Sequence, residues 1–411
     1  MNILVLNSGS SSLKYQLIDL ENEEALAKGL AERIGVRTAE GSCLMHEAKG
    51  KKPYNVSADM PNHDVAMDVV FQALTDPEAG AIRDICEISA VGHRVVHGGE
   101  GFSQPTLITN ETLAEIDKCS ELAPLHNPPN LAGIRACRRV MPDVPQVAVF
   151  DTAFFTPIPK RAYIYALPYN LYKEYGVRRY GFHGTSHRYV TARARKLLAQ
   201  TGMDVSEIKI VSCHLGNGCS ASAVVGGKPI DTSLGMTPAE GLVMGTRGGD
   251  MDPAIIPFLM RRLDMTPDDI DNLINKKSGL LGVSGTSSDM RDIEAKAEAG
   301  DERAALAFDI FCYRARKYVG AYAAAMGGID VIVFTGGIGQ NSPAVRNGIC
   351  EGLGFLGAEI DPRKNDGFRG EGSISKDNAR VRIMVIPTDE EKMIARETAE
   401  VVSDLMASAR R

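Results

Sequence analysis

The sequence predicts a mixed α/β or α+β protein that contains a duplicated domain, and three observations support this. Short apolar runs typical of strands are mixed along the chain with longer amphipathic segments typical of helices. Residues 2–18 and 209–225 share one pattern, in which an apolar run, a turn rich in Gly, Ser and Asn, and a second alternating run follow one another. The length of 411 residues allows two domains with separate cores. We therefore expect a duplicated domain with a site between the two copies.

Each of the two repeated segments predicts a strand, a tight turn and a second strand. Aligning Gly9 with Gly216 places Asn7 opposite His214, so both turns carry a polar side chain at the same position. One such match can arise by chance. Two turns of the size that suits a phosphate, half a chain apart, favour duplication.

Five further elements follow from local signals. Apolar runs predict strands at 146–150 and 330–334. The proline pair at 128–129 suits the first turn of a helix that runs to about residue 140. Residues 302–326 predict a long helix, apolar over much of its surface and so buried in a core or an oligomer interface. The T-x-x-E pattern at 388–391 predicts a capping box for the C-terminal helix, whose apolar face would hold Ile394, Val401, Val402 and Leu405.

Composition excludes several classes of function. Apolar residues make up 44% of the chain and charged residues 24%, as in a globular protein. The net charge of −6 argues against nucleic acid or an anionic membrane as a partner. No apolar run is long enough to span a bilayer, and the first residues lack the basic start of a secretory signal. The eight cysteines form no C-x-x-C pair, so we expect reduced thiols and a cytoplasmic location.

Three glycine-rich turns, each after a predicted strand, indicate a nucleotide site. They cover residues 7–14, 214–218 and 335–341, and each offers backbone amides and short polar side chains to phosphates. Taken singly, each fits an ordinary hairpin or loop. The third is not a dinucleotide fingerprint, because position 342 is serine, and no Walker-type P-loop occurs. The segment 284–291, a serine-rich loop followed by Asp-Met-Arg, fits either a nucleotide contact or a helix N-cap.

Candidate catalytic side chains lie in unusual settings. Arg94 lies in a short apolar strand that paired glycines end, and Arg247 lies in a glycine-containing loop. Both guanidinium groups are therefore expected to be free for anions, although a solvated surface arginine would also fit each position. Asp151 ends the strand at 146–150, a common place for a site carboxylate, although a cap would also fit. His183 and His187 are spaced i, i+4, which allows a zinc hydrolase, but the H-E-x-x-H pattern is missing.

Ten segments together resemble the acetate kinase family. In order along the chain they are LNSGSSSLKY, GHRVVHGG, PLHNPPN, VFDTAFF, YGFHGTSH, HLGNG, MTPAEGLVMGTRGGDMDP, SGTSSDMR, FTGGIGQN and IPTDEE. They extend from residue 6 to residue 391, so the resemblance covers nearly the whole chain. The block MTPAEGLVMGTR is specific to this family and its acyl kinase relatives.

The resemblance implies an α/β fold of two duplicated RNase H-like, actin-like ATPase domains that flank a central cleft, as in sugar kinases, Hsp70 and actin. The first domain would comprise residues 1–151 with 387–411, and the second residues 152–386. The resemblance also implies a homodimer joined through the second domain. The implied activity is reversible phosphoryl transfer from ATP to acetate, giving acetyl phosphate and ADP, with Mg²⁺ as the metal, for which Mn²⁺ can substitute. Such an enzyme would serve acetyl-CoA biosynthesis.

The resemblance also implies roles for particular residues. Asn7 and Glu390 match the magnesium-associated positions, which leaves Glu391 as the capping-box carboxylate. The catalytic positions match Arg94, Asp151, His183 and Arg247, of which Arg94 also holds the acyl carboxylate. The pocket for the acetate methyl group matches Val96, Leu125, Phe182 and Pro238. The ATP contacts match Lys14, His214, Leu215, Gly216, Asn217, Gly218, Asp289, Met290, Arg291, Gly337, Ile338, Gly339, Gln340 and Asn341.

Two positions depart from the family pattern. Gln340 stands where glutamate is expected, which removes a charge near the nucleotide, and Gly248 stands where serine is commoner.

Two alternative functions remain. Propionate differs from acetate by one methylene, whose burial contributes only about 0.8 kcal/mol, so propionate kinase is the runner-up. A non-acyl ATPase of the actin or Hsp70 type would hold nucleotide but would have no need of Arg94.

Overall fold

The computed structural model describes residues 1–36 and 41–409. These residues form two compact units, Met1–Thr156 with Asp389–Arg411 and Pro157–Thr388. The expected boundaries, after residues 151 and 386, lie five and two residues before the observed ones.

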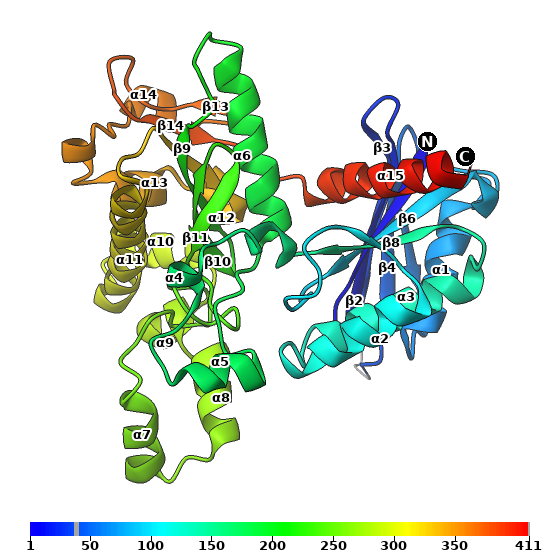
Figure 1. Cartoon of the computed structure of the whole chain (residues 1–411), viewed down its shortest axis with the longest axis horizontal. Coiled ribbons are helices and arrows are strands. Elements are labelled where there is room, and N and C mark those ends of the chain that lie inside the picture. The colour runs from blue at the N-terminus through cyan, green and yellow to red at the C-terminus, as the bar shows by residue number, and fades with distance from the viewer. Residues whose placement is uncertain (37–40, 410–411) are drawn as a thin grey trace. The chain divides into compact units, whose positions relative to one another are not determined.

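The first unit contains an eight-stranded sheet in the order β5-β4-β3-β2-β1-β6-β8-β7 (Figure 1). Strands β1 to β5 form an antiparallel meander, whereas β1, β6 and β8 run parallel to one another. The strands are β1 (Asn2–Ser8), β2 (Ser12–Asp19), β3 (Glu24–Glu32), β4 (Cys43–Ala48), β5 (Tyr54–Ser57), β6 (Ile88–Val95), β7 (Thr106–Leu107) and β8 (Gln146–Phe150).

Helices cover both faces of this sheet (Figure 1). They are α1 (His63–Leu74), α2 (Asn110–Lys118), α3 (Asn127–Val140) and α15 (Glu390–Ala409). Alternate residues of the strands point to opposite faces. Leu4 and Leu6 therefore join the core beneath α1 and α3, while Ile3 and Val5 pack against Ile394 of α15. The C-terminal helix thus completes the first unit.

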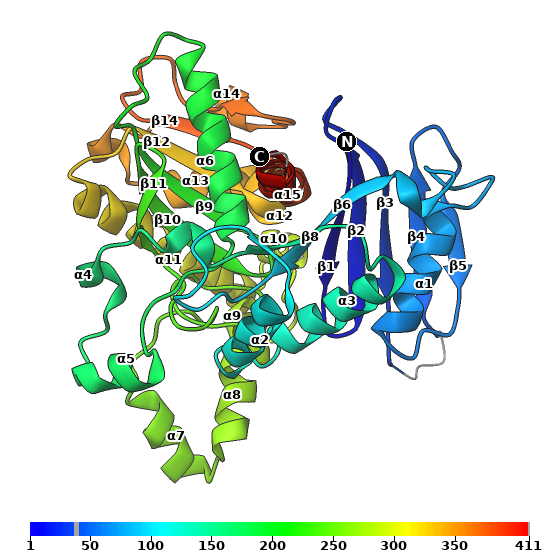
Figure 2. The same cartoon turned by 45° about the vertical axis from the view of Figure 1, so that its right-hand side comes forward.

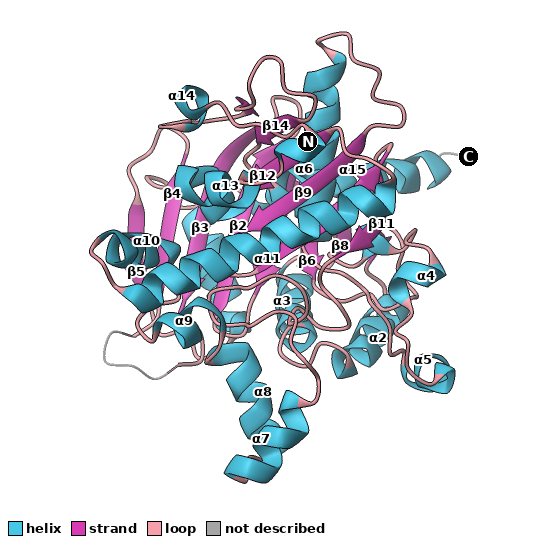
Figure 3. Ribbon diagram, turned by 90° about the vertical axis from the view of Figure 1, so that its left-hand side faces the viewer, coloured by secondary structure: helices cyan, strands magenta, loops and turns pink. Residues whose placement is uncertain are grey.

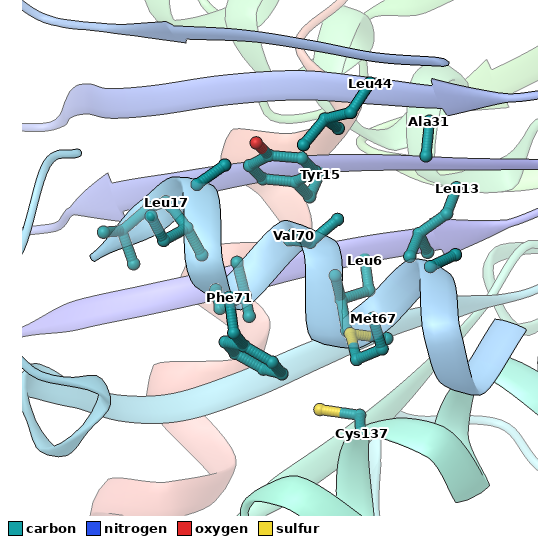
Figure 4. Packing of buried hydrophobic residues seen from close by; sticks show 14 of the residues in the cluster. Leu6, Leu13, Tyr15, Leu17, Ala31, Leu44, Met67, Val70, Phe71 and Cys137 are labelled. Atoms are coloured by element: carbon teal, nitrogen blue, oxygen red, sulfur yellow. The ribbon is translucent and has the colours of Figure 1, made fainter. Parts of the chain in front are cut away.

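Figure 4 shows the larger of these two cores. Met67, Val70 and Phe71 of α1 share this core with Tyr15 of β2 and Cys137 of α3. The Tyr15 hydroxyl is buried and hydrogen-bonds the Nδ1 atom of His46 at 2.5 Å. Its polar atom is therefore satisfied within an apolar layer.

The second unit contains a six-stranded sheet in the order β11-β10-β9-β12-β14-β13. Strands β9, β10 and β11 are antiparallel, and β9, β12 and β14 are parallel. The strands are β9 (Lys209–Leu215), β10 (Cys219–Val225), β11 (Lys228–Thr232), β12 (Val331–Thr335), β13 (Gly372–Ser373) and β14 (Arg382–Val385).

Helices α6 and α11 pack on this second sheet (Figure 3). Helices α7 and α8 form a projecting hairpin (Figure 2). The helices of the unit are α4 (Lys160–Tyr163), α5 (Tyr169–Tyr175), α6 (Gly184–Ala199), α7 (Ile255–Leu263), α8 (Pro267–Lys276), α9 (Gly279–Ser284), α10 (Met290–Glu298), α11 (Glu302–Met326), α12 (Gly336–Asn341), α13 (Pro343–Cys350) and α14 (Pro362–Asn365).

The two sheets share one five-stranded plan, which confirms the duplication. The series β3-β2-β1-β6-β8 and β11-β10-β9-β12-β14 have the same order and the same pattern of parallel and antiparallel pairs. Asn2 begins β1 and Lys209 begins β9, so the strands start at equivalent places in the two repeated segments. The alignment of Gly9 with Gly216 therefore places both turns after equivalent strands.

Most predicted elements form as expected, and three details differ. The third glycine-rich turn is the short helix α12, because its residues continue from β12 into helical backbone. The C-terminal helix begins at Glu390, and Asp389, not Thr388, accepts its capping hydrogen bond from the Lys392 amide. Leu405 is 44% exposed, so it lies outside the buried apolar face of α15.

Candidate active site

Three neighbouring parallel strands of the first unit bring polar side chains to one edge. Asn7 lies near the end of β1, Arg94 near the end of β6, and Asp151 directly after β8. The carboxyl ends of parallel strands commonly form sites in α/β folds, because the strands end together. The strand order β1-β6-β8 therefore converts three positions far apart in the sequence into one cluster.

Arg94 and Asp151 form a two-pronged ion pair within this cluster. The Nε atom of Arg94 lies 3.2 Å from Oδ1 of Asp151, and its Nη2 atom lies 2.6 Å from Oδ2. Burial disfavours the charge of Arg94, but Asp151 and Glu390 more than offset it, so the arginine pKa is raised. The expectation of a free guanidinium is wrong for Arg94, which is already oriented by a carboxylate.

Glu390, the first residue of α15, and Asn7 complete the cluster. The Glu390 carboxylate lies 3.8 Å from Nε of Arg94, and Oδ1 of Asn7 accepts a hydrogen bond from Nη1 of Arg94 at 3.3 Å. The pKa of Glu390 is raised to about 7, mainly because the carboxyl group is buried. The positive charge of Arg94 lowers this pKa, and the negative charge of Asp151 raises it. Two neighbouring carboxylates and an amide oxygen suit Mg²⁺, which prefers oxygen ligands and would offset the repulsion between the carboxylates.

Lys14 and Glu391 form a separate pair in the first unit. The Nζ atom of Lys14, on β2, lies 2.5 Å from the Glu391 carboxylate. The capping-box role expected for Glu391 is therefore wrong, because its carboxylate pairs with a lysine and Asp389 caps the helix.

The four residues expected around the acetate methyl group belong to different units. Val96 and Leu125 lie in the first unit, and Phe182 and Pro238 lie in the second. Val96 and Phe182 are buried, whereas Leu125 is 61% exposed. Val96 follows the last residue of β6, and Oδ1 of Asn130 accepts a hydrogen bond from its backbone amide.

His183 holds an unusual backbone position at the start of α6. Its φ angle is 57°, in the left-handed region, where non-glycine residues are uncommon. Its ring stacks on that of His214, with centroids 4.4 Å apart, and its Nδ1 atom lies 2.9 Å from Oγ of Ser220. A side-chain carbon added at Gly218 would lie 3.4 Å from Nε2 of His183 and 3.9 Å from Nη1 of Arg247. His183 and Arg247 therefore converge on one backbone position.

The Arg247 loop is closed at its base by paired hydrogen bonds. The backbone amide of Asp250 donates to the Gly241 carbonyl, and the Asp250 carboxylate accepts from the Gly241 amide at 2.8 Å. Nη1 of Arg247 donates to the Pro238 carbonyl at 3.1 Å, and burial lowers the arginine pKa. The expected loop is present, but its guanidinium is anchored, not free.

A cavity of about 550 Å³ lies wholly within the second unit. Eight of the residues expected to contact ATP line it, namely Gly216, Asn217, Asp289, Met290, Arg291, Gly337, Ile338 and Asn341. The others do not line it. Lys14 belongs to the first unit, and the remainder are His214, Leu215, Gly218, Gly339 and Gln340, of which Leu215 is fully buried.

The cavity wall also contains Ser288, which lies in the segment 284–291 singled out above, and Glu294 and Ser342, which the sequence did not single out. Ser342 directly follows the predicted turn, and Glu294 lies one helical turn after Met290 on α10, so helical spacing gives a signal for it. Asp289 caps α10, accepting from the Arg291 amide at 2.9 Å, so the N-cap reading also holds. Hydrogen bonds from the Arg291 side chain and backbone lower the pKa of Asp289 to about 2.

The zinc reading has no support from the geometry. Both ring nitrogens of His187 are hydrogen-bonded to serine hydroxyls, Nδ1 to Ser212 at 2.6 Å and Nε2 to Ser220 at 2.7 Å. Within residues 1–36 and 41–409, no group of three or more His, Cys, Asp or Glu side chains is arranged to hold a metal ion. Over the same residues, none of the helices combines the length and the apolar character needed to cross a bilayer.

Comparison with known proteins gives relatives that match nearly the whole chain. The model of the acetokinase family matches residues 2–396. Acetate kinases of Halothermothrix orenii and Clostridium botulinum are each 54% identical to this chain, over 98% of it and the whole of each relative. The crystal structure of Porphyromonas gingivalis acetate kinase superposes with a TM-score of 0.92 at 49% identity, covering 98% of this chain and 99% of its own. A propionate kinase from Francisella tularensis superposes with a TM-score of 0.89 at 42% identity, covering 97% and 99%. The chain belongs to the acetokinase family.

Proposed function

We propose that this protein catalyses the reversible transfer of the γ-phosphoryl group of ATP to the carboxylate of acetate, giving acetyl phosphate and ADP. Family membership and the acetate kinases at 54% identity support this activity. The observation that carries it is the Arg94 cluster, in which Asp151 presents an oriented guanidinium at a strand edge. A carboxylate substrate needs such a group, whereas a non-acyl ATPase does not.

The first unit binds the acceptor in this proposal. Nη1 of Arg94 faces Asn7 and is placed to hold one acetate oxygen, while the other oxygen attacks phosphorus in line. Asp151 orients Arg94. Acetate is already ionised at neutral pH, so the reaction needs no general base, and we assign Asp151 this orienting role.

The second unit binds the nucleotide and stabilises the transition state. The cavity around Asn217, Asp289 and Asn341 receives ATP. His183 and Arg247, which converge on Gly218, donate to the equatorial oxygens of the planar phosphoryl group. Arg247 is partly desolvated, which strengthens its interaction with a charge that develops during the reaction.

We assign Mg²⁺ to Asn7 and Glu390, with Mn²⁺ as a substitute. When bound, the metal supplies positive charge that lowers the repulsion between the phosphates and the acceptor carboxylate. The residues present fit a hard dication, because they offer oxygen atoms and a carboxylate whose pKa is raised by burial.

Acetate is the acid we favour, and propionate is the second candidate. Val96, Phe182 and Pro238 remain the proposed lining of the methyl pocket, together with Leu125 from an exposed position. We also propose that the enzyme is a cytoplasmic homodimer joined through the second unit and that it serves acetyl-CoA biosynthesis, as the resemblance implies.

The test is an acid panel run in both directions. Purified protein is incubated with ATP, Mg²⁺ and acetate, propionate or butyrate, and acyl phosphate is trapped with hydroxylamine. We expect hydroxamate formation and ADP release that depend on the acid, with the highest kcat/KM for acetate. ADP release that is independent of any acid would refute the acyl kinase and favour the non-acyl ATPase.

A further inference from the structure

The interface between α6 and the second sheet contains an unusually polar layer. Ser186 and His187 on α6 and Ser212 and Ser220 on the sheet are all fully buried, at 0% exposure. Ser212 lies on β9 and Ser220 on β10, and both touch the same histidine. Apolar side chains are usual between a helix and a sheet, because buried polar groups stabilise a fold only when all their hydrogen bonds are made.

Three of these polar groups, Ser212, His187 and Ser220, form a continuous chain that ends at His183. Oγ of Ser212 lies 2.6 Å from Nδ1 of His187, and Nε2 of the same ring lies 2.7 Å from Oγ of Ser220. Oγ of Ser220 lies 2.9 Å from Nδ1 of His183. The far nitrogen of His183 is the one that approaches Gly218 and Arg247.

The buried end of this chain determines its direction. The hydroxyl of Ser212 has its one side-chain hydrogen bond, among the described residues, with Nδ1 of His187. If His187 donated to it, the hydroxyl proton of Ser212 would be buried without an acceptor, which is unfavourable. Ser212 therefore donates to Nδ1, and a neutral His187 carries its proton on Nε2. Burial, and next the neighbouring His214, lower the pKa of His187 well below its usual value, consistent with a neutral ring.

Ser220 transmits this direction to His183. The Ser220 hydroxyl is buried, and among the described residues its side-chain hydrogen bonds are to His187 and His183 alone. Once it accepts from Nε2 of His187, its own proton has Nδ1 of His183 as the available acceptor, so Ser220 donates to that atom. A neutral His183 that accepts at Nδ1 carries its proton on Nε2, which is the atom directed toward Gly218 and Arg247.

We infer that Ser220 and Ser212, acting through His187, are positioning residues that hold neutral His183 as the Nε2–H tautomer, ready to donate to the transferring phosphoryl group. The role of this donor rests on the proposed function, whereas the tautomer itself does not. Other groups that face His183 are the stacked ring of His214 and, across Gly218, the guanidinium of Arg247. His214 is itself held by Oγ of Ser186 at 2.8 Å from its Nδ1 atom.

Kinetics of the serine variants test the consequence for catalysis. Ser220→Ala should lower kcat about 10- to 100-fold and leave the KM values for ATP and acetate within about twofold, because orientation of a transition-state donor is lost while ground-state binding is kept. Ser222→Ala is the matched control. Ser222 is equally buried, two residues along the same strand, and its hydroxyl bonds Thr232 instead of a histidine. We expect its kcat to be unchanged, and an equal loss in both variants would overturn the inference.

Nitrogen-15 NMR of the histidine rings tests the tautomer directly, without acetate. Above the pKa of His183, the wild-type spectrum should show an unprotonated Nδ1 and a protonated Nε2. In Ser220→Ala the two tautomers should mix, and in Ser222→Ala they should not. A wild-type His183 with its neutral proton on Nδ1 would overturn the inference even if Ser220→Ala failed to fold. If acid-dependent activity were missing but the tautomer were as described, the proposed function would fail and the hydrogen-bond chain would stand.

Discussion

At the scale of single residues, the two arginines of the candidate site differ in how they are held. The Asp151 carboxylate pairs with Arg94. The guanidinium of Arg247, within the part of the chain that the structure describes, hydrogen-bonds a backbone carbonyl and contacts a methionine sulfur. A group whose charge is already compensated suits ground-state binding of the acceptor. A group that lacks a counter-charge suits a charge that grows during the reaction.

Substitution of these arginines should therefore affect different kinetic constants. Arg94→Ala should mainly raise the KM for acetate, because it removes the carboxylate partner. Arg247→Ala should lower kcat by about 10²–10³, as expected for loss of a transition-state donor. Steady-state kinetics with each substrate varied in turn measure both effects. If Arg247→Ala changed only KM, its assignment to the transition state would be wrong.

Glu390 and Glu391 are adjacent glutamates with different surroundings. Glu391 therefore serves as a matched control for a test of Glu390 as a metal ligand. Glu390 lies near Arg94 and Asp151, whereas Glu391 pairs with Lys14. Glu390→Gln should raise the Mg²⁺ concentration needed for half-maximal activity by about tenfold or more, since it removes a charged ligand. Glu391→Gln should leave this concentration nearly unchanged. A magnesium titration of both variants decides the matter, and identical curves would remove Glu390 from the metal site.

At the scale of secondary-structure elements, β6 contains a buried histidine whose protonation opposes folding. Nε2 of His93 hydrogen-bonds Oε1 of Gln146 on β8 at 2.8 Å, and burial lowers the pKa of His93 to about 4 from 6.5. Between these two values the unfolded chain binds more protons than the folded one. The stabilisation is therefore complete above about pH 6.5 and is lost as the pH falls toward 4.

The contribution of His93 should be measurable in the pH dependence of the free energy of unfolding. Between pH 7.5 and pH 5, His93 should reduce the free energy of unfolding by about 2 kcal/mol. His93→Gln keeps a donor for Gln146 but cannot titrate. The free energy of unfolding of this variant should therefore fall less between the two pH values than that of the wild type, by about 2 kcal/mol. Urea denaturation at both pH values gives the comparison. Equal losses in the two proteins would show that His93 is not the group responsible.

Two helical glycines predict opposite effects of added side chains. A Cβ atom at Gly133, on α3, would collide with Oγ of Ser8 on β1, whereas one at Gly320, on α11, would meet nothing within 4 Å. Gly133→Ala should lower the free energy of unfolding by about 1–3 kcal/mol through overpacking. Gly320→Ala should raise it by about 0.5–1 kcal/mol, because alanine favours helix. Thermal unfolding checks both, and a stabilising Gly133→Ala would contradict the close packing of α3 on β1.

At the scale of the whole molecule, the proposed function assigns nucleotide binding to the second unit and acetate binding to the first. The cavity lies entirely in Pro157–Thr388, and the Arg94 cluster lies entirely in Met1–Thr156 with the C-terminal helix. Arg94→Ala should therefore leave the Kd for a nonhydrolysable ATP analogue within about twofold, even though catalysis with acetate fails. Asn217→Ala, on the cavity wall, should weaken nucleotide binding about tenfold by removing a polar contact. Titration calorimetry measures both, and weaker binding in Arg94→Ala would contradict this division.

The sequence by itself determined the α/β class, the duplicated strand-turn-strand segments and the residue types available for chemistry. These features depend on local patterns, such as the alternation in β1 and β2 or the proline pair that opens α3, and local backbone preferences express them directly. Eight of the ATP contacts that the resemblance implied line one cavity, and they lie on the second and third glycine-rich turns and at the start of α10.

Only the tertiary structure decided how those residues are paired. The strand order β1-β6-β8 brings Asp151 to Arg94 from 57 positions away in the sequence, and α15 adds Glu390 from the far end of the chain. The same packing pairs Glu391 with Lys14, and Asp389 accepts the hydrogen bond that caps α15. Such pairings depend on sheet order and on burial, which set the geometry and the pKa of each group. No local sequence pattern specifies these partners. The guanidinium groups of Arg94 and Arg247 were therefore expected to be free, whereas the fold provides hydrogen-bond acceptors that orient both.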